Sequence, residues 1–270
     1  GARVALRTDT HAPSFSGEVE LLHDVFSFRT PEERTEVTGA FAVHAARLQP
    51  VPGTGSEYAL RLSVILHDTL QDVVTRRDTV VRVRRQGDDH YVRAHVTLPV
   101  LPSEHTVYRL VARDATGGAG RVTAGGSVIR DLAGPALMVS DVVLALPDSA
   151  GDWVRGNLRL ALALPRSFEP ERPFTVFYEV YNIAEGSPYS TRITVEPAER
   201  RGGIGRLFGG RAPGAIDLRF DDTARLAPGG VLQESRRVAS DLPAGRYRMV
   251  VTVTSEGRTA RTETLFSVDR

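Results

Sequence analysis

The sequence predicts an all-β protein made of two tandem immunoglobulin-like antiparallel β-sandwich domains. Two observations carry this fold class: apolar residues recur with a period of two along most of the chain, and turn residues interrupt the pattern about every 8 to 12 residues. A third observation is the break at Gly134 and Pro135, after which a fresh series of strand patterns begins. We therefore expect an N-terminal domain over residues 1–134 and a C-terminal domain over residues 135–270.

The first half carries its strand patterns in several stretches. Two stretches leave the pattern: residues 16–28 fit either a helix or a strand, and Thr30 to Arg34 has the composition of a capped single turn. The clearest alternation places one set of side chains on the core face, namely Tyr58, Leu60, Leu62, Val64 and Leu66. Arg82 and Arg84 share a face of a later strand and are interpreted as charges on a solvated sheet edge.

The second half contains about eight short strands, the number typical of an immunoglobulin-like sandwich. They span residues 136–147, 157–165, 174–183, 189–197, 215–226, 231–239, 245–257 and 258–269. The last hairpin resembles the last hairpin of the first half, with Tyr108 aligned on Tyr247 and Gly118 on Gly257. We expect each tyrosine to bury its ring at a corner while its hydroxyl binds a backbone partner.

Composition excludes several classes of function. The chain has 270 residues and a formal net charge of +1, which argues against a general nucleic-acid binder. Its basic residues are all arginine, and the absence of cysteine excludes disulfides and thiolate metal sites. No apolar run approaches the roughly 20 residues that span a bilayer. No catalytic, cofactor-binding or metal motif is present, so we expect a protein that is not an enzyme and has no cofactor.

The aromatic strand at residues 174–181 is the first candidate binding surface. Alternation turns Phe174, Val176, Tyr178 and Val180 toward the core and turns Phe177, Glu179 and Tyr181 toward water or a partner. We expect Glu179 to pair with an arginine such as Arg192 on the next strand. A platform on which Phe177 and Tyr181 stack against a sugar is the alternative.

A glycine-rich basic loop at residues 198–214 is the second candidate. It offers an aliphatic and an aromatic side chain among arginines, a composition suited to docking on an acidic partner. The alternative is that Leu207 and Phe208 fold back on their own domain. The predicted partner-binding residues of this loop are Arg200, Arg201, Arg206, Leu207, Phe208 and Arg211.

Residues 136–270 resemble the C-terminal part of bacterial GWxTD-domain proteins. The resemblance is carried by "ALMVSDVVLA" (136–145), "YEVYNI" (178–183) and "TVEP" (194–197). The Gly-Trp-x-Thr-Asp motif itself is absent, since the single tryptophan, Trp153, lies in "GDWVRG". The resemblance implies a β-rich exported protein and carries over no catalytic residue.

These observations predict a non-catalytic structural or interaction protein. The sequence begins at Gly1 and not at methionine, which indicates either a removed signal peptide or numbering that begins inside a longer protein. Of the two we expect the first, in a periplasmic protein. The expected role is an accessory subunit that docks on a larger complex, with membrane-embedded respiratory or photosynthetic assemblies among the candidates, and that has protein partners but no nucleic acid and no transmembrane segment. A carbohydrate-binding module for cell-envelope polysaccharide and a non-catalytic part of a larger enzyme are the alternatives.

Overall fold

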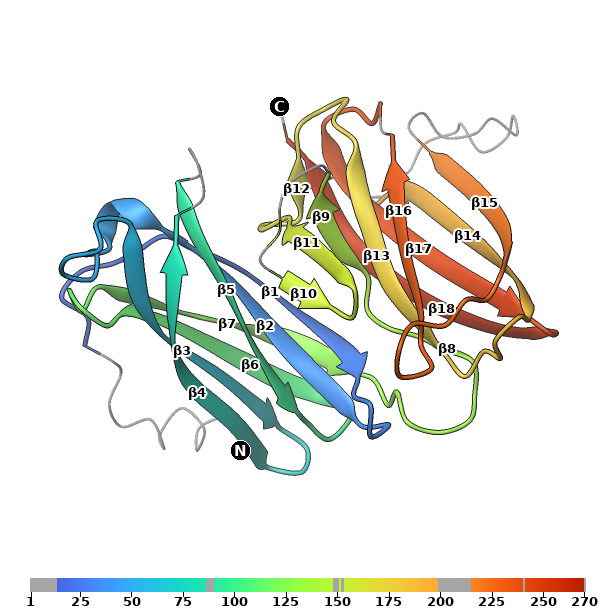
Figure 1. Cartoon of the computed structure of the whole chain (residues 1–270), viewed down its shortest axis with the longest axis horizontal. Helices are drawn as coiled ribbons and strands as arrows, with labels where there is room; N and C mark the ends of the chain where they lie inside the picture. Colours follow the sequence, from blue (N-terminus) through green and yellow to red (C-terminus); the bar gives the residue numbers. More distant parts are fainter. Residues whose placement is uncertain are drawn as a thin grey trace. The chain divides into compact units, whose positions relative to one another are not determined.

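The computed structural model describes residues 14–85, 90–147, 151, 153–198, 215–239 and 241–269. Almost all regular structure in these residues is β, and the one helical segment among them is a short 3-10 turn at Ala45–Arg47. The chain divides into two compact units, residues 1–133 and 134–270 (Figure 1). Each unit is an antiparallel sandwich with its own core, so the predicted fold class is confirmed.

The first unit packs a three-stranded sheet on a four-stranded sheet. The strand order is β1-β2-β5 in the smaller sheet and β4-β3-β6-β7 in the larger one. Its strands are β1 (Leu21–Arg29), β2 (Thr35–His44), β3 (Glu57–Asp68), β4 (Val73–Arg84), β5 (Tyr91–Pro99), β6 (Ser103–Asp114) and β7 (Gly120–Ile129).

The segment that fitted either helix or strand forms β1. It pairs with β2 along its whole length, from Leu21 opposite Val43 to Arg29 opposite Thr35. A tight turn joins the two strands, and within it the Glu33 N–H donates to the Thr30 carbonyl at 3.0 Å. Every residue of β1 has a cross-strand partner, and this pairing outweighs the weak helical pattern of the sequence, so the segment forms a strand.

The core of the first unit lies between its two sheets. Leu60, Leu62, Val64 and Leu66 of β3 are all buried, as the alternation predicted. Gly39 of β2 faces Val64 of β3 and Leu110 of β6. A Cβ placed at Gly39 would lie 2.8 Å from Val64 Cγ2, so any larger residue would push the sheets apart.

The second unit is a larger sandwich. One sheet has the order β10-β11-β9-β13-β16, with β8 also paired to β13, and the other has the order β12-β18-β17-β14-β15. Its strands are β8 (Met138–Val139), β9 (Val143–Leu146), β10 (Trp153–Arg155), β11 (Leu158–Leu162), β12 (Ser167–Phe168), β13 (Phe174–Tyr181), β14 (Pro188–Pro197), β15 (Ile216–Thr223), β16 (Leu232–Val238), β17 (Gly245–Ser255) and β18 (Arg258–Val268).

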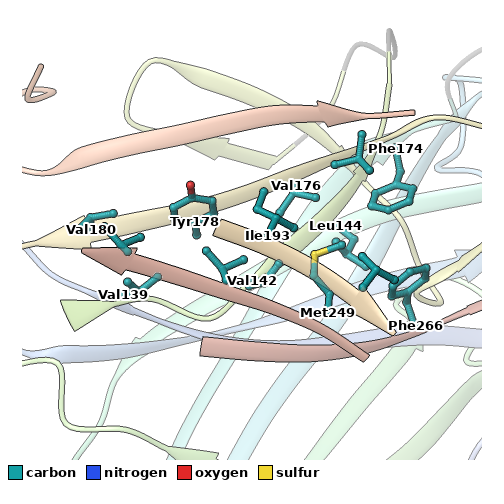
Figure 2. Close-up of a cluster of buried hydrophobic side chains, with 14 of the residues drawn as sticks. Val139, Val142, Leu144, Phe174, Val176, Tyr178, Val180, Ile193, Met249 and Phe266 are labelled. Carbon is teal, nitrogen blue, oxygen red and sulfur yellow. The ribbon is translucent and has the colours of Figure 1, made fainter. Parts of the chain in front are cut away.

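The core of the second unit confirms one face of the aromatic strand. Phe174, Val176, Tyr178 and Val180 of β13 are fully buried in a single apolar cluster. Figure 2 shows these four side chains pointing from β13 toward residues of the opposite sheet, including Met249 of β17. The inner face of β13 was therefore predicted correctly.

The two aligned tyrosines behave differently. Tyr247 is buried, and its hydroxyl donates to the Pro243 carbonyl oxygen at 2.6 Å, which confirms the expected corner in the second unit. The Tyr108 hydroxyl lies 3.3 Å from His23 Nε2 of β1 and is half-buried. For Tyr108 the contact shown is with a side chain of the facing sheet, and a backbone partner at that corner stays a prediction.

Candidate functional site

The outer face of β13 is buried, contrary to the prediction. Phe177 and Tyr181 are 0% exposed and Glu179 is 2% exposed. The expectation that these residues face water or a partner is wrong. In this structure neither ring is available to stack on a sugar or on a second protein.

The short strand β10 contributes to this burial. The Trp153 ring packs edge-on against Phe177, with ring centroids 5.5 Å apart. β10 is hydrogen-bonded to β11 and not to β13, so its side chains reach β13 from above the sheet. The turn between β10 and β11 contains Gly156 at φ +56°, close against the Gln233 side chain.

The Glu179 carboxylate is saturated with hydrogen bonds. Arg155 of β10 holds it with two parallel bonds, Nε to Oε1 and Nη2 to Oε2, each at 2.9 Å. Gln233 Nε2 of β16 donates to Oε1 at 2.9 Å, and the Tyr181 hydroxyl donates to Oε2 at 2.7 Å. Each oxygen therefore accepts two bonds, which makes the group a structural lock between β10, β13 and β16.

Arg192, the partner predicted for Glu179, lies elsewhere. It belongs to β14 in the opposite sheet and makes two hydrogen bonds to Asp217 of β15, at 2.9 and 2.8 Å. The prediction is wrong because it assumed that consecutive strands pair, whereas the chain crosses from one sheet to the other between β13 and β14.

A second buried polar group, which the sequence analysis missed, lies inside the second sandwich. Glu234 of β16 is 5% exposed and accepts a hydrogen bond from the Tyr189 hydroxyl of β14. Arg236 Nε lies 2.6 Å from Glu234 Oε2, and its guanidinium stands over the Phe220 ring of β15. Burial followed by the bond to Glu234 raises the pKa of the Tyr189 hydroxyl. A signal was present, since Glu234 and Arg236 lie on the strand face that also carries Leu232 and Val238.

The outer face of the four-stranded sheet in the first unit carries a different chemistry. Successive strands place arginines on this face, because their neighbours in sequence point into the core. We define the arginine face by its six cations, Arg61, Arg76, Arg82, Arg84, Arg109 and Arg113. Two carboxylates share the face, Glu57 and Asp78, so its strand residues carry four more positive charges than negative ones.

Apolar side chains lie between these arginines. Val74, Val80, Val107 and Val128 are 50%, 56%, 44% and 55% exposed, and they belong to β4, β6 and β7. Scattered apolar residues are ordinary on a protein surface, but here they share one sheet face with a concentration of arginines. Arginine together with apolar contact area is typical of protein–protein interfaces.

Asp78 is tied into the arginine face. It accepts hydrogen bonds from Arg76 Nε at 2.7 Å and from Ser63 Oγ at 2.5 Å. Partial burial raises its pKa, but the hydrogen bonds from Arg76 and Ser63 and the charges of Arg76 and Arg61 outweigh this effect. The pKa of the Asp78 carboxyl is therefore below its usual value.

The predicted loop residues lie outside the part of the chain that the structure describes. This applies to Arg200, Arg201, Arg206, Leu207, Phe208 and Arg211. Within the described ranges, no three histidine, cysteine, aspartate or glutamate side chains come together in a group able to hold a metal ion. The same ranges contain no helix long and apolar enough to cross a bilayer.

Comparison with known proteins gives only distant structural likeness. No family model matches the chain, and no curated protein matches it. Among similar solved structures, red sea bream transglutaminase has 14% identity and a TM-score of 0.24, and this chain spans 34% of its length. Escherichia coli alpha-2-macroglobulin has 10% identity and a TM-score of 0.35, with all but 7% of this chain matched to 26% of that one. The FN1–FN3 domains of chicken CNTN1 have 10% identity and a TM-score of 0.27, with 92% of this chain matched to 67% of that one.

Proposed function

We propose that this chain is a non-catalytic interaction protein, an accessory periplasmic subunit that docks on a larger complex and stabilises it. The observation that carries the proposal is the arginine face, where exposed valines lie among six arginines and two carboxylates. A face of this composition gains free energy when a partner covers the valines and pairs the arginines.

The buried polar groups of the second unit support a scaffold. Glu179 has both oxygens occupied by donors from three strands, and Glu234 is held by Tyr189 and Arg236. Carboxylates that are buried and held by side chains of neighbouring strands fix those strands relative to one another. The proposal assigns them to the rigidity of the sandwich.

The location in the periplasm is supported by the resemblance of residues 136–270 to GWxTD-domain proteins, which are mostly exported. The absence of cysteine is compatible with an oxidising compartment. The sugar-binding alternative loses its support, because its two aromatic residues, Phe177 and Tyr181, are buried.

The test is affinity purification of the tagged chain from gently solubilised membranes of cells that produce it, with mass spectrometry of the co-eluting proteins. The variant Arg61→Glu/Arg109→Glu/Arg113→Glu reverses the centre of the arginine face. The control Arg246→Glu/Arg258→Glu/Arg261→Glu reverses the same number of charges on β17 and β18 of the second unit.

We expect a defined set of membrane subunits to co-elute with the wild type and with the control variant, and to be lost with the arginine-face variant. Circular dichroism spectra of the three proteins establish that each is folded. Recovery of the wild-type chain alone from the soluble fraction would overturn the subunit proposal. If the membrane subunits co-elute equally with both variants, the arginine face is not the surface through which the chain docks.

A further inference from the structure

The edge strand of the first unit is long and regular. β4 pairs with β3 over twelve residues, from Glu57 opposite Arg84 to Asp68 opposite Val73. Among the described residues no further strand shares backbone hydrogen bonds with β4, which forms the end of its sheet (Figure 1). The facing sheet contacts it where Arg77 Nη1 of β4 donates to the Thr97 carbonyl oxygen of β5 at 2.6 Å. A row of backbone N–H and C=O groups on the side of β4 away from β3 is therefore oriented to pair with another strand.

The side chains of the last part of β4 alternate in chemistry. Arg82 and Arg84 point to the outer face and are 71% and 76% exposed, and each lies 3.5 Å from a carboxylate oxygen of Glu57. Val81 and Val83 point to the inner face and are only half-buried against the core. A strand added beside β4 would meet cations on one face and apolar surface on the other.

We propose that β4 binds an extended acidic segment of a partner protein, which adds to the sheet as a fifth strand. This inference rests on the proposed function and names the partner chemistry of the same sheet. The segment alternates acidic residues, which pair with Arg82 and Arg84, with apolar residues, which cover Val81 and Val83. Backbone hydrogen bonds supply affinity, and the alternation supplies specificity.

Charge complementarity selects this occupant over a second copy of the chain. β4 carries four arginines and one aspartate, so two β4 edges placed side by side would each bring a net charge of +3, and like charges on neighbouring strands are destabilising. An extended polypeptide is also the partner that matches a row of backbone donors and acceptors at the spacing of a strand.

The probe is a fluorescein-labelled peptide, acetyl-Glu-Val-Glu-Val-Glu-Val-Glu-amide, whose binding to the full chain is followed by fluorescence anisotropy. A second peptide has lysine in place of each glutamate. A third keeps the glutamates and carries N-methyl groups on the nitrogens of all seven residues, so that neither edge of the extended peptide donates these hydrogen bonds. The protein variants are Arg82→Glu/Arg84→Glu and, as control, Arg258→Glu/Arg261→Glu.

We expect saturable binding of the glutamate peptide to the wild type and to the control variant. The Arg82→Glu/Arg84→Glu variant should bind at least about tenfold more weakly, because two attractive pairs become repulsive. The lysine peptide should not bind. Hydrogen exchange should slow at amides between Val73 and Arg84 when the glutamate peptide is bound, and remain unchanged in the second unit.

Equal affinity for the N-methylated peptide, or for the Arg82→Glu/Arg84→Glu variant, would overturn the added strand. Failure of this inference is separable from failure of the proposed function. If membrane subunits co-elute with the Arg82→Glu/Arg84→Glu variant as they do with the wild type, the chain docks without the β4 edge. If the wild type elutes alone, the docking proposal itself fails.

Discussion

Arg155 and Glu179 form a two-bond ion pair across the face of a sheet, between strands that share no backbone hydrogen bonds. The Arg155 side chain is 20% exposed and the Glu179 side chain is 2% exposed. The pair therefore connects β10 to β13 through side chains alone. Because the Glu179 carboxylate is buried, the stability of the folded second unit depends on all of its hydrogen-bond donors.

Glu179→Gln should destabilise the second unit strongly. The substitution keeps the shape of the side chain but removes its charge, which leaves Arg155 without its counter-charge in a mostly buried position. Breaking a buried pair in this way costs about 3 kcal/mol of unfolding free energy. Urea unfolding followed by Trp153 emission measures the effect, since this single tryptophan lies beside Phe177 in the same unit.

The matched control is Asp217→Asn, which breaks the Arg192–Asp217 pair. That pair has the same two-bond geometry, but its side chains are 48% and 28% exposed. Exposed pairs contribute less than about 1 kcal/mol. If both substitutions lower the unfolding free energy equally, burial is not the reason for the stability of the Arg155–Glu179 pair.

The sequence predicted the inner face of β13 but not its outer face. Alternation specifies which residues share a face, and it placed Phe174, Val176, Tyr178 and Val180 together correctly. It does not specify what covers the second face. Trp153 lies 24 residues before Phe177 in the chain, and nothing local indicates that β10 turns back over β13. The sequence likewise predicted only part of the arginine face, namely Arg82 and Arg84. The six cations come from three strands, and the local pattern of each strand does not indicate which strands are neighbours in the sheet.

Tyr247→Phe should cost more stability than Tyr108→Phe, although the two tyrosines align in the sequence. The Tyr247 hydroxyl donates to the Pro243 carbonyl at 2.6 Å from a buried ring, and its loss removes this short hydrogen bond, at about 1 kcal/mol. The Tyr108 hydroxyl has a longer contact, 3.3 Å to His23 Nε2, in a half-buried site, and we expect less than about 0.5 kcal/mol there. Trp153 emission follows the second unit, and far-ultraviolet circular dichroism follows both units. If the two variants lose equal unfolding free energy, the Tyr247–Pro243 hydrogen bond contributes no more than the Tyr108–His23 contact.

The loss of folding stability at acidic pH should depend in part on the Asp78 carboxylate. Its pKa in the folded state lies below the unfolded value of about 3.9, so its contribution is fully present above that pH and is lost as the pH falls through the folded pKa. The difference in melting temperature between wild type and Asp78→Asn should therefore be constant near neutral pH and shrink below about pH 4. Thermal melts at fixed ionic strength measure it. Ser63→Ala removes one hydrogen-bond donor to Asp78 and should retain part of the pH dependence. If the difference in melting temperature between wild type and Asp78→Asn grows as the pH falls, the lowered pKa of Asp78 is contradicted.

Gly39→Val should destabilise the first unit and leave the second unit unchanged. A Cβ at residue 39 would lie 2.8 Å from Val64 Cγ2 and 3.1 Å from Leu110 Cδ2, so the added side chain must displace both sheets, at about 2 kcal/mol. Gly126→Ala is the matched control, because its Cβ would have no neighbour closer than 4.0 Å in an exposed part of β7. Combining Gly39→Val with Val64→Ala restores space at the contact and should recover part of the loss, since the two positions touch. In Gly39→Val the circular dichroism transition of the first unit should move to lower denaturant, while the midpoint followed by Trp153 emission stays the same. If the unfolding free energy lost in the double variant equals the sum of the losses in the two single variants, crowding at Val64 is not the cause.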